Sequence, residues 1–174
     1  MVRIAARLQA AAADNQTLPA ILKEAGWTIM GVDGGASSAI IGAFFTGMAE
    51  GCPGEALDCI AFAQTCEAGL MAVRKFTPAK PGDKTLLDAL APAVSELSSA
   101  AERGQDILNA LRSAAEAAER GARATSDLPA RLGRARYRGE MTLGHPDPGA
   151  TSIALLFDGF LRGFAAPIGE SHNA

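Results

Sequence analysis

Apolar residues recur at spacings of three and four along almost the whole chain. Residues at these spacings lie on one face of an α-helix, so the pattern predicts amphipathic helices. Glycines, prolines and short polar stretches interrupt the pattern. The predicted helices span about 1–13, 17–32, 39–50, 55–76, 84–103, 106–125 and 147–161. About seven helices joined mostly by short connections predict an all-α bundle.

Several predicted helices have recognisable ends or irregularities. Thr17 is a good N-cap, with Pro19 in the first turn that follows. Asp83 is expected to cap the helix over 84–103, and Pro92 is expected to bend the middle of that helix. The helix over 1–13 begins without a capping residue, which is unusual for a helix start.

The longest interruption lies between residues 125 and 149, where helical periodicity stops. This segment is rich in glycine and proline and is crowded with arginine. Connections longer than about 12–15 residues are uncommon in compact domains, and they are usually functional or disordered. Apolar residues such as Leu132, Tyr137, Met141 and Leu143 are atypical of a disordered linker. The segment is therefore interpreted as functional, with a plain surface excursion as the alternative.

Composition narrows the class of protein. A chain of 174 residues is typical of one domain with one core. Aromatic residues are only 5% of the chain, which favours close-packed helices over a β-sandwich. The net charge of −3 argues against a general nucleic-acid-binding protein. The arginines between residues 131 and 138 are then a local feature, directed at a phosphate or a carboxylate.

Cysteine usage and hydropathy bear on the compartment. Cys52, Cys59 and Cys66 complete neither a disulfide framework nor a zinc site, so they are expected to be buried reduced thiols. The N-terminus lacks the apolar stretch of a signal peptide. No apolar run reaches the ~20 residues that a membrane-spanning helix needs. A cytoplasmic protein without a membrane association is expected.

Three predicted helix starts combine glycine with small polar residues, at 34–37, 82–85 and 147–151. Helix N-termini leave N–H groups unpaired and carry partial positive charge, so they bind anions. If the three starts converge, they form a phosphate cradle in which Ser37 donates from its hydroxyl and Arg134 acts as a charged clamp. The alternative is that each is only a helix cap, for which Asp83 and Asp147 are well suited. No Walker A loop and no clustered carboxylates for a metal occur in the chain.

Four motifs in order carry a resemblance to a known family. They are Gly34-Gly35-Ala36-Ser37, Pro81-Gly82-Asp83-Lys84-Thr85-Leu86, Gly133-Arg134-Ala135 and Gly144-His145-Pro146-Asp147-Pro148-Gly149-Ala150. The chain resembles the nucleotide-binding domain of dihydroxyacetone kinase, called the L subunit where it is a separate chain. The resemblance implies a single nucleotide-binding domain over 1–174. It also implies the family's antiparallel barrel of eight helices, about seven of them in this chain, with ADP or ATP bound at one end.

The resemblance also assigns roles to residues. The nucleotide-binding residues that it implies are Gly35, Ala36, Ser37, Leu86, Arg134, Asp147, Pro148 and Gly149. Ala36 and Ser37 would hold phosphate and Leu86 would pack on the adenine side. Arg134, also the expected catalytic residue, would close over the nucleotide together with the 147–149 turn. A glycine of the family is replaced here by Thr77, which puts that contact in question.

The largest departure from the family is at the start of the chain. The family carries G-D-x-D-H-G, whose aspartates hold two magnesium ions, and Met1 lines up just after that motif. The Mg²⁺ ligands are therefore expected upstream of Met1, with none in this chain. Two explanations stay open: a start codon upstream of Met1, or a true remnant that lacks the first helix.

Loss of a helix from a closed barrel predicts an exposed apolar stripe on the last helix. The residues expected to be exposed there are Ile153, Leu156, Phe157 and Phe160. Exposed apolar patches of this kind promote association, so self-association is expected.

Two functions follow from the resemblance. The first is the ADP- or ATP-binding subunit of a kinase for dihydroxyacetone or a related short ketose, with the substrate held on a K-type partner subunit. A separate chain favours the phosphotransferase-linked version, in which a further protein donates the phosphoryl group, over the ATP-dependent version. Without the aspartates, little activity is expected from the chain as given. The second is a catalytically inactive module for protein interaction or regulation.

Overall fold

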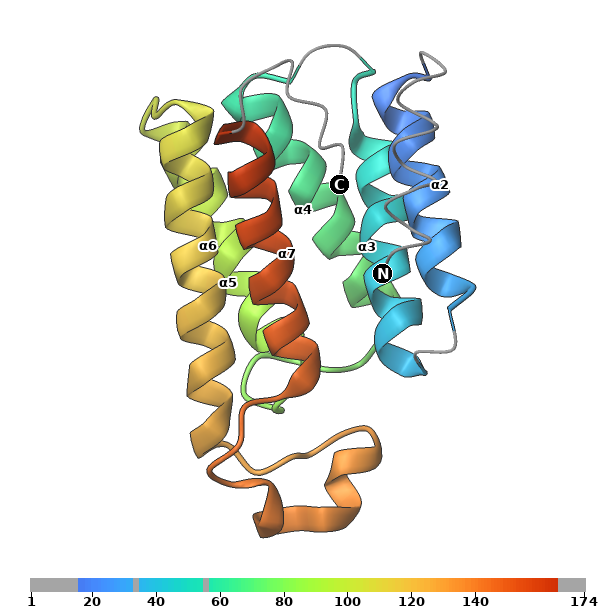
Figure 1. Ribbon diagram of the computed structural model, residues 1–174, viewed down its shortest axis with the longest axis vertical. Coiled ribbons are helices and arrows are strands. Elements are labelled where there is room, and N and C mark those ends of the chain that lie inside the picture. Colours follow the sequence, from blue (N-terminus) through green and yellow to red (C-terminus); the bar gives the residue numbers. More distant parts are fainter. Residues whose placement is uncertain (1–15, 33–34, 55–56, 166–174) are drawn as a thin grey trace, which may run out of the picture.

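The computed structural model describes residues 16–32, 35–54 and 57–165, with Arg134 and Gly139 described by their backbone alone. Six α-helices run side by side (Figure 1). They are α2 (Leu18–Met30), α3 (Ala36–Gly51), α4 (Cys59–Phe76), α5 (Leu87–Glu102), α6 (Ile107–Ala124) and α7 (Pro148–Ala165). These ranges contain no strand, and the predicted all-α class is confirmed. The helix predicted over 1–13 lies outside the described residues.

Successive helices run in opposite directions along the bundle. As a consequence α3, α5 and α7 all begin at the same end, from which the connection between α6 and α7 also projects (Figure 1). We call residues 125–147 of this connection the arm. The arm contains two 3-10 helices, η1 (Thr125–Asp127) and η2 (Arg134–Thr142). Its apolar side chains Tyr137 and Met141 are 78% and 81% exposed, so the arm has no apolar core of its own around them.

Thr17 is the N-cap residue of α2, as predicted, although its side chain forms no capping hydrogen bond. Two aspartates that were not predicted as caps serve α4 and α6. The carboxylates of Asp58 and Asp106 accept hydrogen bonds from N–H groups in the first turns of α4 and α6, at 2.7 and 2.9 Å. The predicted Asp83 cap is wrong, because α5 begins only at Leu87. Lys84 has a positive φ of 60°, outside the helical region, so a helix cannot start there.

The core joins two groups of three helices. Helices α2, α3 and α4 pack together, as do α5, α6 and α7, and α4 packs against α5 between the groups. Aromatic rings close the remaining side. The ring of Phe160 on α7 lies 6.3 Å from that of Phe45 on α3 and 5.9 Å from that of Phe62 on α4, measured between ring centroids. Such edge-to-face pairs add stability beyond the area that they bury.

The stripe predicted to be exposed on α7 is not exposed. Ile153 and Phe157 are fully buried, while Leu156 and Phe160 are half-buried. The prediction was wrong because α7 turns this face toward α5, α6 and the aromatic rings. That argument for self-association is therefore removed.

The prediction of buried, reduced thiols is confirmed in part. Cys66 is buried and Cys52 and Cys59 are half-buried, and all three are free thiols. Burial raises the pKa of the Cys66 thiol, so it stays protonated and inert. No helix in the described part of the chain combines the length and apolar character needed to cross a bilayer.

The closest helix contact gives a test of this packing. A Cβ added at Gly121 of α6 would lie 2.1 Å from the backbone oxygen of Asp88 on α5, so the two helices must separate. We expect Gly121→Ala to lower the free energy of unfolding by about 1–3 kcal/mol. Gly159 of α7 is the matched control, because a Cβ there meets nothing within 4 Å. Gly159→Ala should raise stability by about 0.5–1 kcal/mol through helix propensity. Urea unfolding measures both, and equal effects would contradict the close packing of α5 on α6.

Candidate functional site

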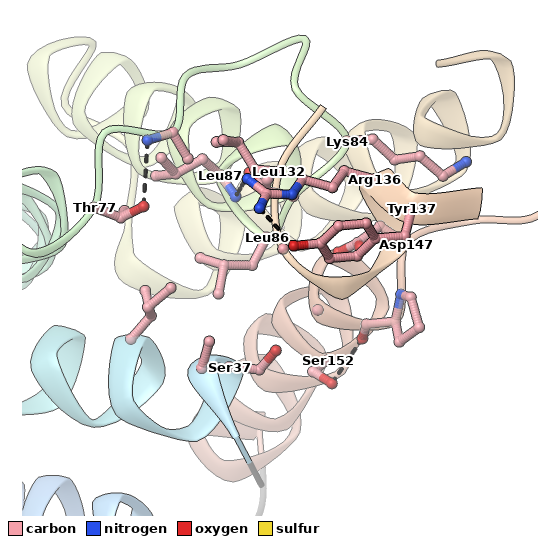
Figure 2. A pocket seen from close by; sticks show the side chains of 18 residues that line it. Ser37, Thr77, Lys84, Leu86, Leu87, Leu132, Arg136, Tyr137, Asp147 and Ser152 are labelled. Carbon is pink, nitrogen blue, oxygen red and sulfur yellow. Dashed lines mark hydrogen bonds between the residues drawn. The ribbon is translucent and has the colours of Figure 1, made fainter. Parts of the chain in front are cut away.

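A cavity of about 840 Å³ lies at the end of the bundle where α3 and α7 begin. Pockets for small molecules in proteins usually measure about 300–1,000 Å³. Four segments line it: the start of α3, the stretch 77–87 before and into α5, residues 132–137 of the arm, and residues 147–152 at the start of α7. Figure 2 shows Arg136 and Tyr137 on one side, Ser37 and Ser152 on the other, and Leu86 between them.

Most residues predicted for the site line this one cavity. They are Ala36, Ser37, Leu86, Asp147, Pro148 and Gly149. Gly35 directly precedes Ala36 as the N-cap of α3. For Arg134 only the backbone is described, and it lies between the lining residues Gly133 and Ala135. The structure thus brings together segments from opposite ends of the sequence, while the roles of these residues stay predictions.

The start of α3 is open to a ligand. Gly35 has φ 67° and ψ −150°, a backbone conformation that favours glycine, and it offers no side chain to cap the helix. The Ser37 side chain is exposed, and none of the described residues forms a hydrogen bond with its hydroxyl. No side chain among the described residues accepts from the first N–H groups of α3, so within this part of the chain they are available to an anion, together with the partial positive charge of the helix end.

The other two starts already hold carboxylates of the protein. At α7, Asp147 Oδ2 accepts a hydrogen bond from Ala150 N at 2.8 Å. Before α5, the Asp88 carboxylate accepts from Gly82 N at 2.5 Å and from Thr85 N at 2.7 Å. A phosphate would have to displace these carboxylates. Of the three starts predicted as a cradle, α3 is thus the one that can receive an anion directly.

Burial governs the charge of Asp147. Desolvation raises the pKa of this carboxyl and nearby Asp88 raises it further, while the N–H groups of Ala150 and Gly149 and the charge of Lys84 act in the opposite direction. The cavity therefore contains a carboxyl that is harder to ionise than an exposed one.

The floor of the cavity is apolar and tightly packed. A Cβ added at Gly149 would lie 3.3 Å from Leu86 Cβ and 2.9 Å from Asp147 Oδ2, so glycine lets α7 approach the Leu86 turn. Leu87 and Leu132 extend the apolar lining. Thr77 also lines the cavity, with φ −140° and ψ 142°, an extended conformation that needs no glycine.

Sequence reasoning missed two residues of the arm. The resemblance assigned Arg136 no nucleotide contact and left it either solvated or facing the partner subunit; it is exposed, and it also lines the cavity beside Tyr137. Arg136 Nη2 donates to Tyr137 Oη at 2.7 Å, and its guanidinium carbon lies 4.7 Å from the ring centroid of Tyr137. This stacked pair presents a cation and an aromatic edge to the cavity. An arginine next to the single tyrosine of the chain, in a glycine-bounded loop, was the available signal.

The third residue missed is Lys84, which is only 5% exposed and lines the cavity. Its Nζ donates to the carbonyl oxygens of Thr125, Thr142 and His145, each at 2.7 Å. No residue type near Lys84 indicated the positive φ of 60° at this position.

The described residues do not fit a metal held by the protein. They contain no group of three or more His, Cys, Asp or Glu side chains placed to bind one ion. Asp147 is the carboxylate in the cavity lining, and it is engaged by its own helix. A nucleotide fits better, because an open helix start, a hydroxyl and an apolar floor lie together.

Comparison with known proteins defines the class. The DAK2 domain family model matches residues 1–162, and the chain belongs to this family. It is 37% identical over 137 residues to the ADP-binding subunit DhaL of the PEP-dependent dihydroxyacetone kinase of Escherichia coli, covering 78% of this chain and 65% of that subunit. It is 39% identical over 130 residues to human triokinase/FMN cyclase, covering 74% of this chain and 22% of that enzyme. The chain thus spans slightly under two thirds of the bacterial subunit.

A solved structure shares the fold. The dihydroxyacetone kinase of C. freundii in its native form aligns with a TM-score of 0.65 at 24% identity, covering 92% of this chain and 27% of that one. The helical fold is therefore that of the L-type domain of dihydroxyacetone kinases, as the sequence predicted.

The pKa of Asp147 predicts a pH dependence. The folded state holds this proton more tightly than the unfolded chain, so the stabilisation is present at low pH and is lost as pH rises through the folded pKa. Relative to Asp147→Asn, the free energy of unfolding of the wild type should fall as pH rises above the ordinary value of 3.8. Denaturant titrations at a series of pH values measure this.

Asp106 is the matched control with the opposite sign. It is also an N-cap, but hydrogen bonding to Asn109 N lowers its pKa. Relative to Asp106→Asn, the wild type should lose stability as pH falls through that lowered pKa. The same sign of pH dependence for both pairs would contradict the burial of Asp147.

Proposed function

We propose that this chain is the nucleotide-binding part of a kinase for dihydroxyacetone or a related short ketose. It binds ADP or ATP and serves phosphoryl transfer to a substrate held on a K-type partner subunit. The observation that carries the proposal is the open N-terminus of α3 at a cavity whose floor is apolar. Membership of the DAK2 family supports the same class of ligand.

Each part of the cavity has a role in this proposal. The N–H groups at Ala36 and Ser37 and the Ser37 hydroxyl bind phosphate, and Leu86 packs against the base. Arg134 acts as the clamp on the transferring group, and the 147–149 turn closes the site. The bound nucleotide supplies the phosphoryl group. The chain's own residues orient it and balance its charge.

The composition of the arm favours the binding of a partner subunit at the mouth of the cavity. Tyr137, Met141 and Arg138 are exposed on it, and these residue types are enriched in protein interfaces. The E. coli relative and a Listeria innocua relative are ADP-binding subunits of PEP-dependent kinases. We therefore favour the phosphotransferase-linked version, with a separate phosphoryl donor protein and a cytoplasmic location, over direct use of ATP.

One observation favours the alternative, an inactive module for interaction or regulation. The described residues do not fit a magnesium ion held by the protein. In this proposal the metal ligands come from residues preceding Met1 in the gene, and the alternative applies if that stretch encodes no such residues.

The first prediction for this function concerns nucleotide binding by the chain as given. With the helix start present but no carboxylates for the metal, ADP with Mg²⁺ should bind weakly, because without a bound magnesium ion only arginine side chains such as Arg134 and the helix start offset the polyphosphate charge. Isothermal titration calorimetry checks this. Micromolar or tighter binding that depends on magnesium would contradict it.

The second prediction concerns Arg134, and it is tested in a protein to which the family's G-D-x-D-H-G motif has been added before Met1. Arg134→Lys keeps the charge but removes the planar guanidinium, and should lower the rate of phosphorylation about a hundredfold, for a loss of about 2–4 kcal/mol. Arg138→Lys is the control, because Arg138 is exposed and does not line the cavity. Steady-state phosphorylation of dihydroxyacetone in the reconstituted complex measures both. Equal losses would count against a phosphate contact by Arg134.

A further inference from the structure

We propose that Lys84 is a positioning residue that holds the arm over the cavity, and that its ammonium group fixes Gly133–Tyr137 at the mouth of the site. The link to nucleotide affinity rests on the function proposed above. The anchoring of the arm does not depend on it.

The ammonium group joins both ends of the arm. Its three acceptors are the carbonyl oxygen of Thr125, where the arm begins, and those of Thr142 and His145, where η2 ends and the chain returns toward α7. A lysine ammonium has three N–H donors, so the three contacts at 2.7 Å use all of them. One side chain therefore contacts both ends of the arm at once.

Neighbouring hydrogen bonds align the same two ends. Thr125 Oγ1 accepts from Asp147 N at 2.7 Å, and Ser126 O accepts from Gly144 N at 2.9 Å. Arg131 N donates to Asp83 O at 3.2 Å, beside the lysine. These bonds are made between backbone and short side chains at the base of the arm. Lys84 is the charged group among them, and charge-assisted hydrogen bonds are about twice as strong as neutral ones.

Lys84 does not act by binding the ligand directly. All its donors are taken by carbonyl oxygens, and Figure 2 shows its ammonium directed away from Ser37 and Ser152. Its effect on a ligand must pass through the position of the arm, whose residues 132–137 line the cavity.

The backbone at Lys84 allows the side chain to be tested apart from the turn. With φ at 60°, glycine suits this position better than any residue with a Cβ. Lys84→Gly therefore removes the ammonium while easing the backbone, whereas Lys84→Met removes the ammonium and keeps the left-handed strain. Lys80→Met is the matched control, because Lys80 lies in the same loop with an exposed side chain.

The first measurement is digestion of the ligand-free protein by an arginine-specific protease. Substitution of a lysine does not remove any cleavage site of this protease. The arm exposes Arg131, Arg136 and Arg138. Cleavage at these sites, followed by mass spectrometry, should be at least tenfold faster in Lys84→Gly and Lys84→Met than in wild type or Lys80→Met. Cleavage at Arg103 and Arg112, outside the arm, should not change. Unchanged cleavage of the arm in both Lys84 variants would overturn the proposal.

Chemical rescue separates the ammonium from a loss of packing. n-Butylammonium has the size and charge of the side chain that Lys84→Gly lacks, and it should return arm cleavage toward the wild-type rate. 1-Butanol, of similar size but without charge, should not. Equal rescue by both compounds would mean that Lys84 only fills space. The same conclusion would follow if neither compound rescued the variant and a low urea concentration produced the same arm cleavage in the wild type.

Titration with ADP connects the arm to the ligand. If wild type binds ADP, even at millimolar concentration, the Lys84 variants should bind at least tenfold more weakly, and n-butylammonium should recover affinity in Lys84→Gly. An affinity unchanged in the variants despite a released arm would overturn the positioning role. Absence of ADP binding in wild type, at any concentration and with the aspartate motif restored, would instead refute the proposed function and leave the protease result to decide on the anchoring.

Discussion

The alternation of helix direction is the constraint on which the site depends. In an antiparallel bundle with short connections, every second helix begins at the same end, so the starts of α3, α5 and α7 are neighbours although the sequence separates them widely (Figure 1). Partial positive charge from several helix ends accumulates there. The protein neutralises two of these ends with Asp88 and Asp147 and leaves α3 open. Among the described residues, the start of α3 is thus the one of the three without a carboxylate cap, which is why it carries the proposed anion site.

The arm is stabilised mainly by hydrogen bonds at its base. A segment without an apolar core must pair its backbone groups in other ways, and those of the arm are paired at its base. Placing an ammonium group among three carbonyl oxygens is favourable because each oxygen has a lone pair directed at a donor, and costly if any one of them moves away. The arrangement is therefore cooperative, and the base of the arm is expected to form or open as a unit.

The sequence predicted the parts of this structure that depend on local periodicity and capping. The helix from Pro148 begins directly after Asp147, which was expected to suit a cap, and the helix predicted over 106–125 is observed over 107–124, because capping and periodicity are local properties. The start of α5 was misplaced, since nothing in the residue type of Lys84 signals a positive φ, and the acceptors of its ammonium group lie 41 to 61 residues away in the sequence.

The site was predictable to a similar extent. Motifs located the cavity lining at α3, Leu86 and the 147–149 turn, because these residues serve the backbone geometry of helix ends. Lys84, Arg136 and Tyr137 were not found, because their positions result from how the arm folds back. The α7 stripe was misjudged for the same kind of reason: which face of an apolar helix is covered depends on how its neighbours pack, and Phe157 is fully buried.

The aromatic rings that connect the two groups of helices affect the width of the cavity at the starts of α3 and α7. Phe45 and Phe160 meet between these two helices, and the starts of the same helices form two walls of the cavity. An α-helix bends little over a few turns, so a change in the distance between α3 and α7 at the rings would also change the distance between the starts of these helices. The distance between these two walls of the cavity is therefore set in part by the packing of Phe45 against Phe160, about three helical turns from the starts of α3 and α7.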